Sequence, residues 1–518
     1  MAEEPSIGFL ALIVAPARVQ GPERGFARVT REQGNHMAAV DVVVVGGGLA
    51  GLTAANRSLL KGLSVIVLEK GEDEHYLCNS RIASGSFNLA HSDPTGDAAF
   101  LKQAILDDTE GYADPNLAAA LAGVAGTAMQ WFRSEGAKFI KVTRTKRQQP
   151  LWSMAPPRPS APGFGWQGRG PDAALQALTK NFKTRGGTLM LGARAERILV
   201  EGGRCVGIAA VVGGKPMEFR ARSVVLADGG FQGNLDLVRR FISPAPERLT
   251  QRNAKTGRGD ALLMAEAIGA KIVGADRFYG HLLVPESMTN DRLWPYPTID
   301  SLASSAIVID QSGRRFLDEG AGGVTMTNII ARLPDPLSTL TVFDDAMWET
   351  TGRAEFTPPN PYVVSEGGNF TKASSIAELA SAIGVPADAL AETIHTYNEA
   401  VESGNHAALN PARTPGRLFG VLRSSETRTS ILPIKKAPFY AIRLCPGITY
   451  TMGGIAIDPQ ARVMGTNDAP IPGLYAAGAC TGGLEGGPLA GYIGGLCKAL
   501  SLGYIAAESI GSEAVVHA

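Results

Sequence analysis

The sequence has few cysteines and no excess of charge of either sign. Its 518 residues include 5 cysteines, no two of them spaced as Cys-x-x-Cys, and its 49 Lys and Arg residues are matched by 49 Asp and Glu residues. Scattered cysteines in odd number argue against a disulfide framework, a zinc site or an iron–sulfur cluster, and they favour a reducing, cytoplasmic location. The balanced charge argues against a nucleic-acid-binding protein, which usually carries a basic excess. We therefore expect no metal site and no nucleic-acid partner.

The sequence also lacks a hydrophobic run long enough to cross a membrane. The apolar stretch "IGFLALIVA" at residues 7–15 is too short for a span, and it follows Glu3 and Glu4, where a signal peptide has basic residues. We therefore predict no membrane span. We interpret residues 1–37 as an N-terminal extension that is disordered and separate from the fold.

Glycine is abundant, with 62 copies, and three glycines near the start of the predicted fold form a motif. The run "VDVVVV" at residues 40–45 is typical of a parallel strand that is buried on both faces. Gly46, Gly48 and Gly51 follow it with GxGxxG spacing. In this motif the first glycine allows a tight turn, the second lets a pyrophosphate approach the backbone, and the third lets the helix pack closely against the strand.

Two further strands support this interpretation. "SVIVLEK" at residues 64–70 predicts a strand with Glu69 near its end, where an acidic residue binds a ribose hydroxyl in dinucleotide-binding folds. "IPGLYAAGACTGG" at residues 471–483 predicts a strand that ends in a second glycine loop, and an apolar helix is predicted after it. The sequence therefore predicts a dinucleotide-binding α/β fold, and the return of the chain at its end favours FAD over NAD.

Five more motifs occur along the chain in a fixed order. They are "CNSRIASGSFNLA" (78–90), "SVVLADGGFQGN" (223–234), "KTGRGDALLMAEAIGAKI" (255–272), "IDQSGRRFLDE" (309–319) and "ITYTMGGIAID" (448–458). With them, the sequence resembles the fumarate reductase/succinate dehydrogenase flavoprotein superfamily through nearly the whole chain after Val40. The resemblance implies a discontinuous, Rossmann-like FAD-binding domain at residues 38–275 and 434–518. It also implies an inserted α+β capping domain at residues 276–433.

The resemblance also implies which residues contact FAD. Asp228 stands where the family usually carries threonine or serine, and Ser80 lies near the position of the histidine of members with covalent FAD, so we expect non-covalent FAD. The residues expected at the cofactor are Gly46, Gly48, Leu49, Ala50, Gly51, Glu69, Lys70, Asn79, Ser80, Gly85, Ala195, Ala227, Asp228, Gly229, Thr256, Gly257, Gly259, Asp260, Gly478, Ala479 and Ile493.

The residues that would make the protein a fumarate reductase are mostly replaced. His281 falls where a carboxylate-binding histidine lies in soluble fumarate reductases. Trp348 takes the place of their arginine acid, Tyr450 takes the place of their second histidine, and "GLEGGPLAGYIGG" has no arginine to hold a carboxylate. We therefore do not predict a fumarate reductase.

Two subfamilies resemble the chain more closely. "PLAGYIGG", "PGITYT", "NSR" and "RRFLDEG" resemble FAD-dependent tricarballylate dehydrogenases, which implies an organic-acid substrate and electron transfer to a separate iron–sulfur, haem or quinone-linked protein. Tyrosines near the flavin resemble those of 3-ketosteroid dehydrogenases, which implies a ketone or enone substrate. A non-catalytic flavin-binding electron carrier is the alternative outside the enzymes.

The two substrate classes differ in the charge that their binding sites need, and the sequence contains candidate residues for both kinds of site. A tricarboxylate needs several cations or polar donors, and Arg81 together with a basic run could supply them. A steroid needs an apolar, aromatic mouth. The basic run contains Lys141, Arg144, Lys146 and Arg147, and the aromatic candidates are Trp152, Phe164, Trp166, Phe278, Tyr279, Trp294 and Tyr296.

The expected reaction is a dehydrogenation next to a carboxylate or carbonyl, with transfer of a hydride to FAD. His281 and Arg81 would hold the electron-withdrawing group, unless Arg81 pairs with a nearby acid. Tyr450 or Tyr492 would exchange the proton. Because the pKa of tyrosine is about 10 in water, a nearby cation would have to lower it.

Overall fold

The computed structural model describes residues 39–142, 151–157, 165–294, 298–353, 361–414 and 431–516. The predicted N-terminal extension, residues 1–37, lies outside the described residues. Among the described residues, no helix is both long and apolar enough to cross a bilayer. The same part of the chain contains no group of three His, Cys, Asp or Glu side chains placed to hold a metal ion.

A parallel sheet forms the centre of the FAD-binding region. Its strands lie in the order β20-β9-β1-β2-β6, and β19 is added antiparallel at the edge. The last four valines of β1 are buried, as the all-apolar run predicts for a strand covered on both faces. The strands are β1 (Val40–Val45), β2 (Val65–Leu68), β6 (Thr188–Met190), β9 (Lys215–Leu226), β19 (Arg462–Met464) and β20 (Pro470–Ala476).

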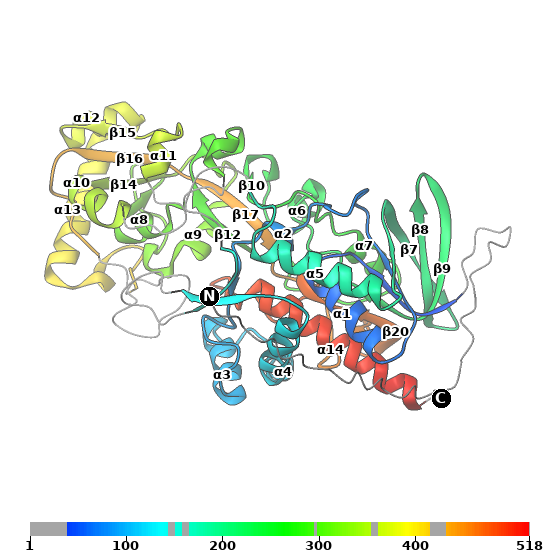
Figure 1. Cartoon of the computed structure of the whole chain (residues 1–518). Helices are drawn as coiled ribbons and strands as arrows, with labels where there is room; N and C mark the ends of the chain where they lie inside the picture. Colours follow the sequence, from blue (N-terminus) through cyan, green and yellow to red (C-terminus); the bar gives the residue numbers. More distant parts are fainter. Residues whose placement is uncertain are drawn as a thin grey trace, which may run out of the picture. The chain divides into compact units, whose positions relative to one another are not determined.

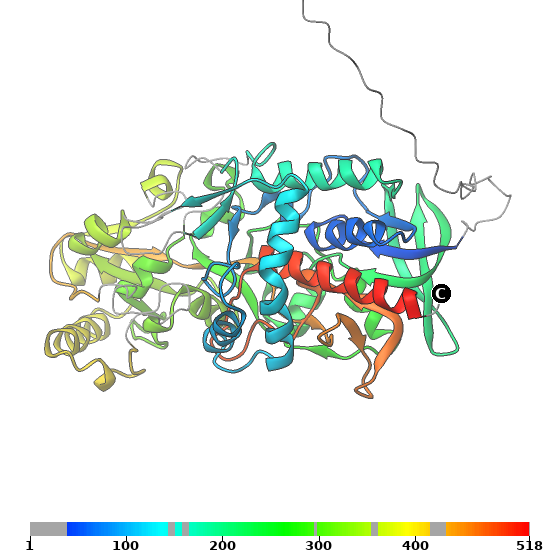
Figure 2. The same cartoon turned by 60° about the horizontal axis from the view of Figure 1, so that its bottom comes forward.

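Helices from both ends of the fold pack on each other beside this sheet. α1 (Leu49–Leu60) and α14 (Gly495–Val516) run side by side in Figures 1 and 2. Small residues allow the close approach, because a Cβ on Gly503 would lie 2.3 Å from the carbonyl oxygen of Ala50. α4 (Pro115–Ser134) packs against α14, and α5 (Gly170–Thr184) packs against α1. The first and last helices of the fold therefore meet next to the glycine loop.

Two smaller sheets complete the FAD-binding region. β7 (Ala193–Glu201) and β8 (Arg204–Val212) extend β9 as an antiparallel meander. Gly202 and Gly203 connect β7 to β8 with φ of 56° and 78°, values that suit the tight hairpin turns in which glycine is preferred. The other sheet contains β3 (Ser86–Phe87), β5 (Leu151–Met154) and β4 (Phe139–Val142).

The capping region is built around a separate four-stranded sheet in the order β13-β14-β16-β15. Its strands are β13 (Ile307–Ile309), β14 (Leu340–Asp344), β15 (Thr371–Ala373) and β16 (Phe439–Arg443), and helices α8 (Asp300–Ser305), α12 (Ile376–Ile383) and α13 (Ala387–Ser403) belong to the same region. β16 pairs with β14 and β15, although it falls in the segment 434–518 that the sequence analysis assigned to the FAD-binding domain. Its place in the cap sheet corrects that assignment, and the other domain limits stay predictions.

A further three-stranded sheet connects the capping region to the cofactor region. Its strands are β10 (Thr250–Gln251), β17 (Cys445–Thr451) and β12 (Phe278–Leu283). β17 follows β16 directly along the chain (Figure 1). A register shift between Tyr279 and Gly280 interrupts the pairing of β12 with β17. The remaining helices and strands are α2 (Asn79–Ile82), α3 (Ala98–Asp108), α6 (Leu235–Phe241), α7 (Asp260–Glu266), α9 (Gly323–Ile330), α10 (Asp345–Met347), α11 (Pro361–Ser365), β11 (Ile272–Val273) and β18 (Gly454–Ile455).

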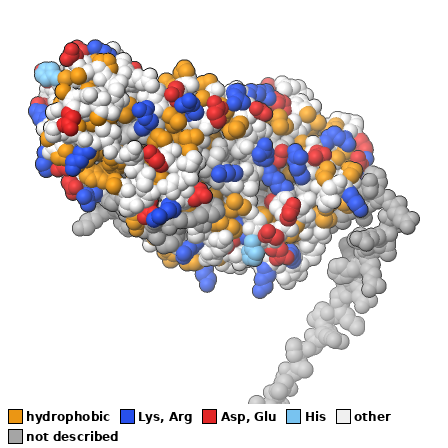
Figure 3. Space-filling model, turned by 90° about the horizontal axis from the view of Figure 1, so that it is seen from above, with side chains coloured by type: hydrophobic (Ala, Val, Ile, Leu, Met, Phe, Trp, Pro, Cys, Tyr) orange, Lys and Arg blue, Asp and Glu red, His pale blue; other side chains and the backbone are white. Residues whose placement is uncertain are grey.

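Charged side chains of both signs alternate on the surface that Figure 3 displays. This pattern agrees with the equal numbers of basic and acidic residues in the sequence. That face therefore presents no extended field of one sign of the kind that attracts nucleic acid.

Candidate active site

The glycine motif forms the turn between β1 and α1, and each glycine has its own steric reason. Gly46 has φ of 101°, and a Cβ there would lie 2.5 Å from the carbonyl oxygen of Ala227. A Cβ on Gly51 would lie 1.9 Å from the carbonyl oxygen of Gly46. A Cβ on Gly48, by contrast, would meet only Ser80 Oγ, at 3.5 Å, and Gly48 lines a large cavity. The first and third glycines therefore serve packing, and the second leaves the backbone open to a ligand.

Glu69 lies at the end of β2, next to this turn. Its side chain is buried, lines the cavity, and accepts hydrogen bonds from the backbone N–H groups of Gly47 (2.7 Å) and Gly71 (2.8 Å). Tyr76 supports the same loop, because its hydroxyl donates to the carbonyl oxygen of Gly47 at 2.6 Å. Lys70 follows Glu69 and pairs with Asp260 at 3.2 Å. These contacts place an acid and a cation at one end of the cavity.

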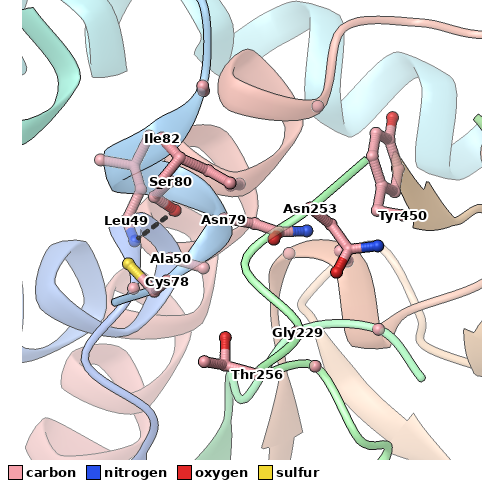
Figure 4. Close-up of a pocket in the computed structure, with 18 of the residues that line it drawn as sticks. Leu49, Ala50, Cys78, Asn79, Ser80, Ile82, Gly229, Asn253, Thr256 and Tyr450 are labelled. Carbon is pink, nitrogen blue, oxygen red and sulfur yellow. Dashed lines mark hydrogen bonds between the residues drawn. The ribbon is translucent and has the colours of Figure 1, made fainter. Parts of the chain in front are cut away.

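The short helix α2 forms the middle of the cavity wall (Figure 4). Ser80 Oγ accepts a hydrogen bond from the N–H of Leu49 at 3.1 Å, which ties α2 to the start of α1. Asn79 accepts from the N–H of Ala254 at 2.8 Å and donates to the carbonyl oxygen of Thr449 at 3.1 Å. Tyr450 lies on the side of the pocket opposite Leu49. The cavity therefore extends from Glu69, past Ser80, to Tyr450.

Two buried polar atoms on the cavity wall lack a hydrogen-bond partner among the described residues. They are Asp228 Oδ1 and Gln232 Oε1. Gly229 lies next to Asp228 with φ of 90°, and a Cβ there would meet no atom within 4 Å. Unsatisfied buried groups beside an open backbone are what a polar ligand leaves when it is removed. With the glycine turn and Glu69, they fit a dinucleotide.

Asp228 also gives the site a testable pH dependence. Burial raises the pKa of Asp228 to about 7, although the N–H of Ala261 and the charge of Lys70 oppose the shift, and Asp260 adds to it. The carboxyl is thus neutral below this pH and negative above it. Because FAD carries a diphosphate, we expect its affinity to fall as pH rises through about 7, by up to tenfold between one unit below and one unit above.

The measurement is a fluorescence titration of the apoprotein with FAD across this pH range. Asp228→Asn is the control, because an amide cannot ionise, and its FAD affinity should change little over the same range. An equal pH dependence in both proteins would contradict the role assigned to Asp228.

Most residues expected at the cofactor line this cavity. They are Gly46, Gly48, Leu49, Ala50, Glu69, Lys70, Asn79, Ser80, Ala195, Ala227, Asp228, Gly229, Thr256, Gly257, Asp260, Gly478 and Ala479. Gly51, Gly85, Gly259 and Ile493 do not line it. Gly259 packs against Phe231, and Ile493 is fully buried in the core. The cavity lining therefore does not support these four residues as cofactor contacts, and for them that role stays a prediction.

His281 lies at the other end of the cavity, on β12. Its Nδ1 contacts Asp300 Oδ2 at 2.5 Å, and its Nε2 contacts the hydroxyl of Tyr279 at 3.1 Å. Asp300 Oδ1 accepts from the N–H of Leu282 at 2.8 Å, which fixes the carboxylate. Burial lowers the pKa of His281, although Asp300 opposes the shift. A neutral His281 donates from Nδ1 to Asp300, and its Nε2 then accepts a hydrogen bond from the Tyr279 hydroxyl.

Three tyrosines pack together beside His281. The rings of Tyr279 and Tyr492 are stacked, with centroids 4.1 Å apart, and Tyr450 lies 5.6 Å from Tyr279. Two of the hydroxyls meet at Gly495, the first residue of α14. The N–H of Gly495 donates to Tyr492 Oη at 3.3 Å, and a Cβ on Gly495 would lie 3.1 Å from Tyr450 Oη. The start of the last helix therefore gathers the predicted proton-exchanging residues.

Tyr450 does not have the environment that the sequence analysis required of a base. Its hydroxyl donates to Glu485 Oε1 at 2.7 Å, and Glu485 Oε2 forms a buried ion pair with Lys498 Nζ. Burial raises the pKa of Tyr450 well above 10, and the negative charge of Glu485 raises it further. The predicted cation is present as Lys498, but Glu485 lies between it and the hydroxyl. The lowered pKa that a tyrosine base would require is therefore not supported at Tyr450.

Arg81 is the clearest correction among the predicted catalytic residues. Its side chain is fully buried, forms an ion pair with Asp172 of α5, and donates to the carbonyl oxygen of Glu74 at 3.0 Å. It does not line the cavity, although Asn79, Ser80 and Ile82 of the same helix do. A one-turn helix points its side chains in different directions, and Arg81 points away. Its role is structural.

Arg252, and not Arg81, is the arginine that lines the cavity near His281. It lines the cavity, donates to Thr449 Oγ1 at 3.3 Å, and its positive charge contributes to the lowered pKa of His281. Lys70 and Arg194 also line the cavity, but both lie within 4 Å of Asp260 at the opposite end. Among the described residues, Arg252 is thus the only Lys or Arg that lines the tyrosine end.

The other predicted substrate contacts divide between wall, core and undescribed residues. Tyr279 and Trp294 line the cavity. Trp348 packs against Phe343 and Phe370 in the cap core, so no acid replaces the fumarate reductase arginine at this position. Away from the lining are Trp152, Trp166, Phe278 and Lys141. Arg144, Lys146, Arg147, Phe164 and Tyr296 lie outside the described residues.

Sequence reasoning missed Glu485, Lys498, Asp300 and Arg252. Residues 471–500 contain only two charged side chains, Glu485 and Lys498, and an isolated acid and base in an apolar, glycine-rich segment are a signal for a buried pair. Tyr279 was named only as part of an aromatic mouth. It stands two residues before His281 on one strand, so alternation predicts that both side chains share a face. Nothing in the sequence distinguished Arg252 from other arginines.

The chain is similar to known oxidoreductases. NADH:fumarate oxidoreductase of Klebsiella pneumoniae (strain 342) is 29% identical over 470 residues, which are 89% of this chain and 47% of that protein. 4-Oxocyclohexanecarboxylate 2-dehydrogenase of Sinomonas cyclohexanicum is 28% identical over 352 residues, which are 64% of this chain and 58% of that protein. The chain therefore spans about half the length of these relatives.

A solved structure gives the same fold. The 3-ketosteroid delta1-dehydrogenase from Sterolibacterium denitrificans matches with a TM-score of 0.71 at 19% identity, over 92% of this chain and 100% of that chain. The family described as "FAD binding domain" matches residues 41–491. The predicted α/β flavoprotein fold and the FAD cofactor are confirmed at this level. The relatives are named as an oxidoreductase and a dehydrogenase, which agrees with the predicted enzyme class. The chain belongs to the FAD binding domain family of flavoproteins.

Proposed function

We propose that the protein is an FAD-dependent dehydrogenase that introduces a carbon–carbon double bond next to a ketone, in a substrate with at most one carboxylate. The observation that carries this proposal is the convergence of Tyr450 and Tyr492 at Gly495, with Arg252 as the one described cation on that part of the wall. Polar hydroxyls suit a carbonyl group, and a single guanidinium suits one carboxylate.

We assign a separate role in the reaction to each polar side chain at this end of the cavity. Tyr492 accepts a hydrogen bond from the N–H of Gly495, and we assign its hydroxyl as a donor to the ketone oxygen. Arg252 holds the carboxylate, and Tyr450 exchanges the proton on the carbon next to the ketone. Stabilising the developing enolate charge in a site shielded from water is the main contribution of such donors. His281 and Tyr279 fix the positions of the neighbouring rings.

The second hydrogen needs a hydride acceptor beside the substrate. FAD, when bound, supplies the acceptor for the hydride from the adjacent carbon. Gly48, Glu69, Lys70 and Ser80 line the cavity that would hold it. Serine at position 80, where the family's covalent members have a histidine nearby, supports non-covalent attachment. A separate iron–sulfur, haem or quinone-linked protein is the electron acceptor that the resemblance to tricarballylate dehydrogenases implies.

Two relatives support the ketone substrate and the direction of the reaction. One is named as a 4-oxocyclohexanecarboxylate 2-dehydrogenase and another as a 3-oxosteroid 1-dehydrogenase of Mycolicibacterium smegmatis. The sequence motifs favour tricarballylate as an alternative substrate. Three carboxylates need several cations, however, and the described wall offers one at this end, so we place the ketone first.

The test is reduction of the bound flavin by candidate substrates under anaerobic conditions. The loss of visible flavin absorbance measures the reduction. We expect 4-oxocyclohexanecarboxylate to bleach the flavin and tricarballylate and succinate to leave it oxidised. Bleaching by tricarballylate alone would contradict the ketone assignment. If no compound bleaches the flavin, and dithionite-reduced protein is not reoxidised by enones or enoic acids, the protein is an electron carrier and not a dehydrogenase.

A further inference from the structure

The buried pair of Glu485 and Lys498 is a feature that the proposed function does not yet use. Both side chains are within 1% of complete burial, and neither lines the cavity. Burying two charges costs several kcal/mol per ion before their attraction is counted, and two apolar residues would pack this position without that cost. The pair therefore calls for a functional explanation.

The structure shows three hydrogen bonds to the carboxylate of Glu485. Oε2 binds Lys498, while Oε1 accepts from the Tyr450 hydroxyl at 2.7 Å and from the N–H of Ile493 at 3.2 Å. Lys498 also lies 5.7 Å from the Tyr450 ring centroid. Glu485 is thus fixed from three sides, and its one link to the cavity is the Tyr450 hydroxyl.

This arrangement determines which group the hydroxyl proton of Tyr450 points to. Because Glu485 is a carboxylate held by a cation, it accepts, and Tyr450 must donate to it. The remaining lone pairs of Tyr450 Oη then face the side of Gly495, which lines the cavity. In this orientation the tyrosine oxygen presents an acceptor, and not a donor, to a bound molecule.

We propose that Glu485, held by Lys498, is the proton acceptor behind Tyr450, and that Tyr450 relays a proton from the substrate to it. The carbon–hydrogen bond next to the ketone breaks, its proton binds Tyr450 Oη, and the original hydroxyl proton moves to Glu485 Oε1. The electron pair of the broken bond becomes the enolate of the ketone. Tyr450 stays neutral throughout, and Glu485 becomes a neutral acid beside Lys498. This inference rests on the proposed function.

The relay explains how a tyrosine with a raised pKa can take part in removing a proton. Burial and the charge of Glu485 raise the pKa of Tyr450, so a free tyrosinate would be rare near neutral pH. In the relay no tyrosinate forms, because the phenol gives up one proton as it receives another. The titratable groups packed around Tyr450 are Glu485, Lys498, Tyr279 and Tyr492.

The first measurement compares flavin reduction by 4-oxocyclohexanecarboxylate in wild-type holoenzyme and in Glu485→Gln. A glutamine keeps the shape and still accepts a hydrogen bond, but it cannot take the proton. We expect reduction to slow about 100-fold or more, the range of general acid–base contributions. Glu485→Gln/Lys498→Met removes the unpaired cation as well. We expect this variant to retain FAD and to reduce equally slowly.

Two outcomes of this measurement would overturn the relay. One is wild-type reduction by Glu485→Gln, and the other is recovery of the rate in Glu485→Gln/Lys498→Met, which would show that only charge balance matters. Glu135→Gln is the matched control, because Glu135 is a buried carboxylate that pairs with Arg185 away from the cavity lining. We expect it to reduce at the wild-type rate.

The second measurement needs no substrate and separates the relay from the proposed function. Ultraviolet difference titration counts tyrosinate among the 11 tyrosines. Removing the Glu485 charge should lower the pKa of Tyr450, so the part of the titration curve that Tyr450→Phe removes should lie at lower pH in the Glu485→Gln background than in the wild-type background. If that part lies at the same pH in both backgrounds, Glu485 does not hold the Tyr450 proton and the relay is wrong. A shifted curve with no reduction of wild-type flavin by the ketone would support the Glu485 contact and reject the substrate.

Discussion

The Gly51→Ala variant should be isolated without FAD. A Cβ at this position would lie 1.9 Å from the carbonyl oxygen of Gly46 and 3.2 Å from a methyl group of Val44. The clash involves backbone, so the turn itself must move, and the turn carries Gly48, the open position at the cavity. Overpacking of this kind costs about 1–3 kcal/mol and sometimes more. We therefore expect loss of the flavin absorbance and a lower melting temperature.

Gly123→Ala is the matched control for this prediction. Gly123 lies in helix α4, is exposed, and a Cβ there would meet no atom within 4 Å. An alanine in an exposed helix stabilises by about 0.5–1 kcal/mol relative to glycine, so this variant should keep FAD and melt at the same or a higher temperature. Full FAD content in Gly51→Ala would contradict the steric role of this glycine.

The Arg252→Met variant should lose most of its activity toward a substrate that carries a carboxylate. Arg252 is the described cation at the tyrosine end of the cavity, and hydrogen bonds to charged groups contribute about 1.5–3 kcal/mol. We expect kcat/KM for 4-oxocyclohexanecarboxylate to fall about 100-fold, which corresponds to about 2.7 kcal/mol. Methionine keeps much of the apolar volume, so FAD content and melting temperature should change little.

A second substrate gives this prediction its control. Cyclohexanone has the ketone but no carboxylate, so its turnover should be weak in wild type and nearly unchanged in Arg252→Met. Arg252→Lys should recover part of the loss, because lysine keeps the charge without the two-pronged geometry. An equal loss for both ketones would show that Arg252 acts on the carbonyl. No loss for either ketone would remove Arg252 from the substrate site.

Local sequence patterns were sufficient for the cofactor half of the site. Gly46, Gly48 and Glu69 sit within one strand–turn–helix–strand unit, where spacing along the chain fixes spacing in the fold. Seventeen of the residues expected at the cofactor line the cavity, and those outside this unit were expected from the resemblance to the flavoprotein superfamily. Gly51 belongs to the same unit, and its packing role against the turn follows from the motif as well.

The substrate half depends on contacts between segments that are far apart in the sequence. Tyr279 of β12 and Tyr450 of β17 are brought together by strand pairing, and α14 adds Gly495 beside them. The sequence analysis named His281, Tyr450 and Tyr492, and all three line the cavity. It did not identify their hydrogen-bond partners. Such a partner can come from any helix or strand, so no fixed spacing in the sequence indicates it.

What the sequence by itself determined is the flavoprotein fold and the position of the cofactor, because glycine spacing and apolar strands act through local backbone geometry and burial. Only the tertiary structure decided that Arg81 is buried against Asp172, that Arg252 lines the wall, and that Glu485 and Lys498 stand behind Tyr450. The direction of a side chain and the charge of its neighbour depend on packing between distant segments. Those two properties decide which arginine faces the cavity and which group accepts the hydrogen bond of the Tyr450 hydroxyl.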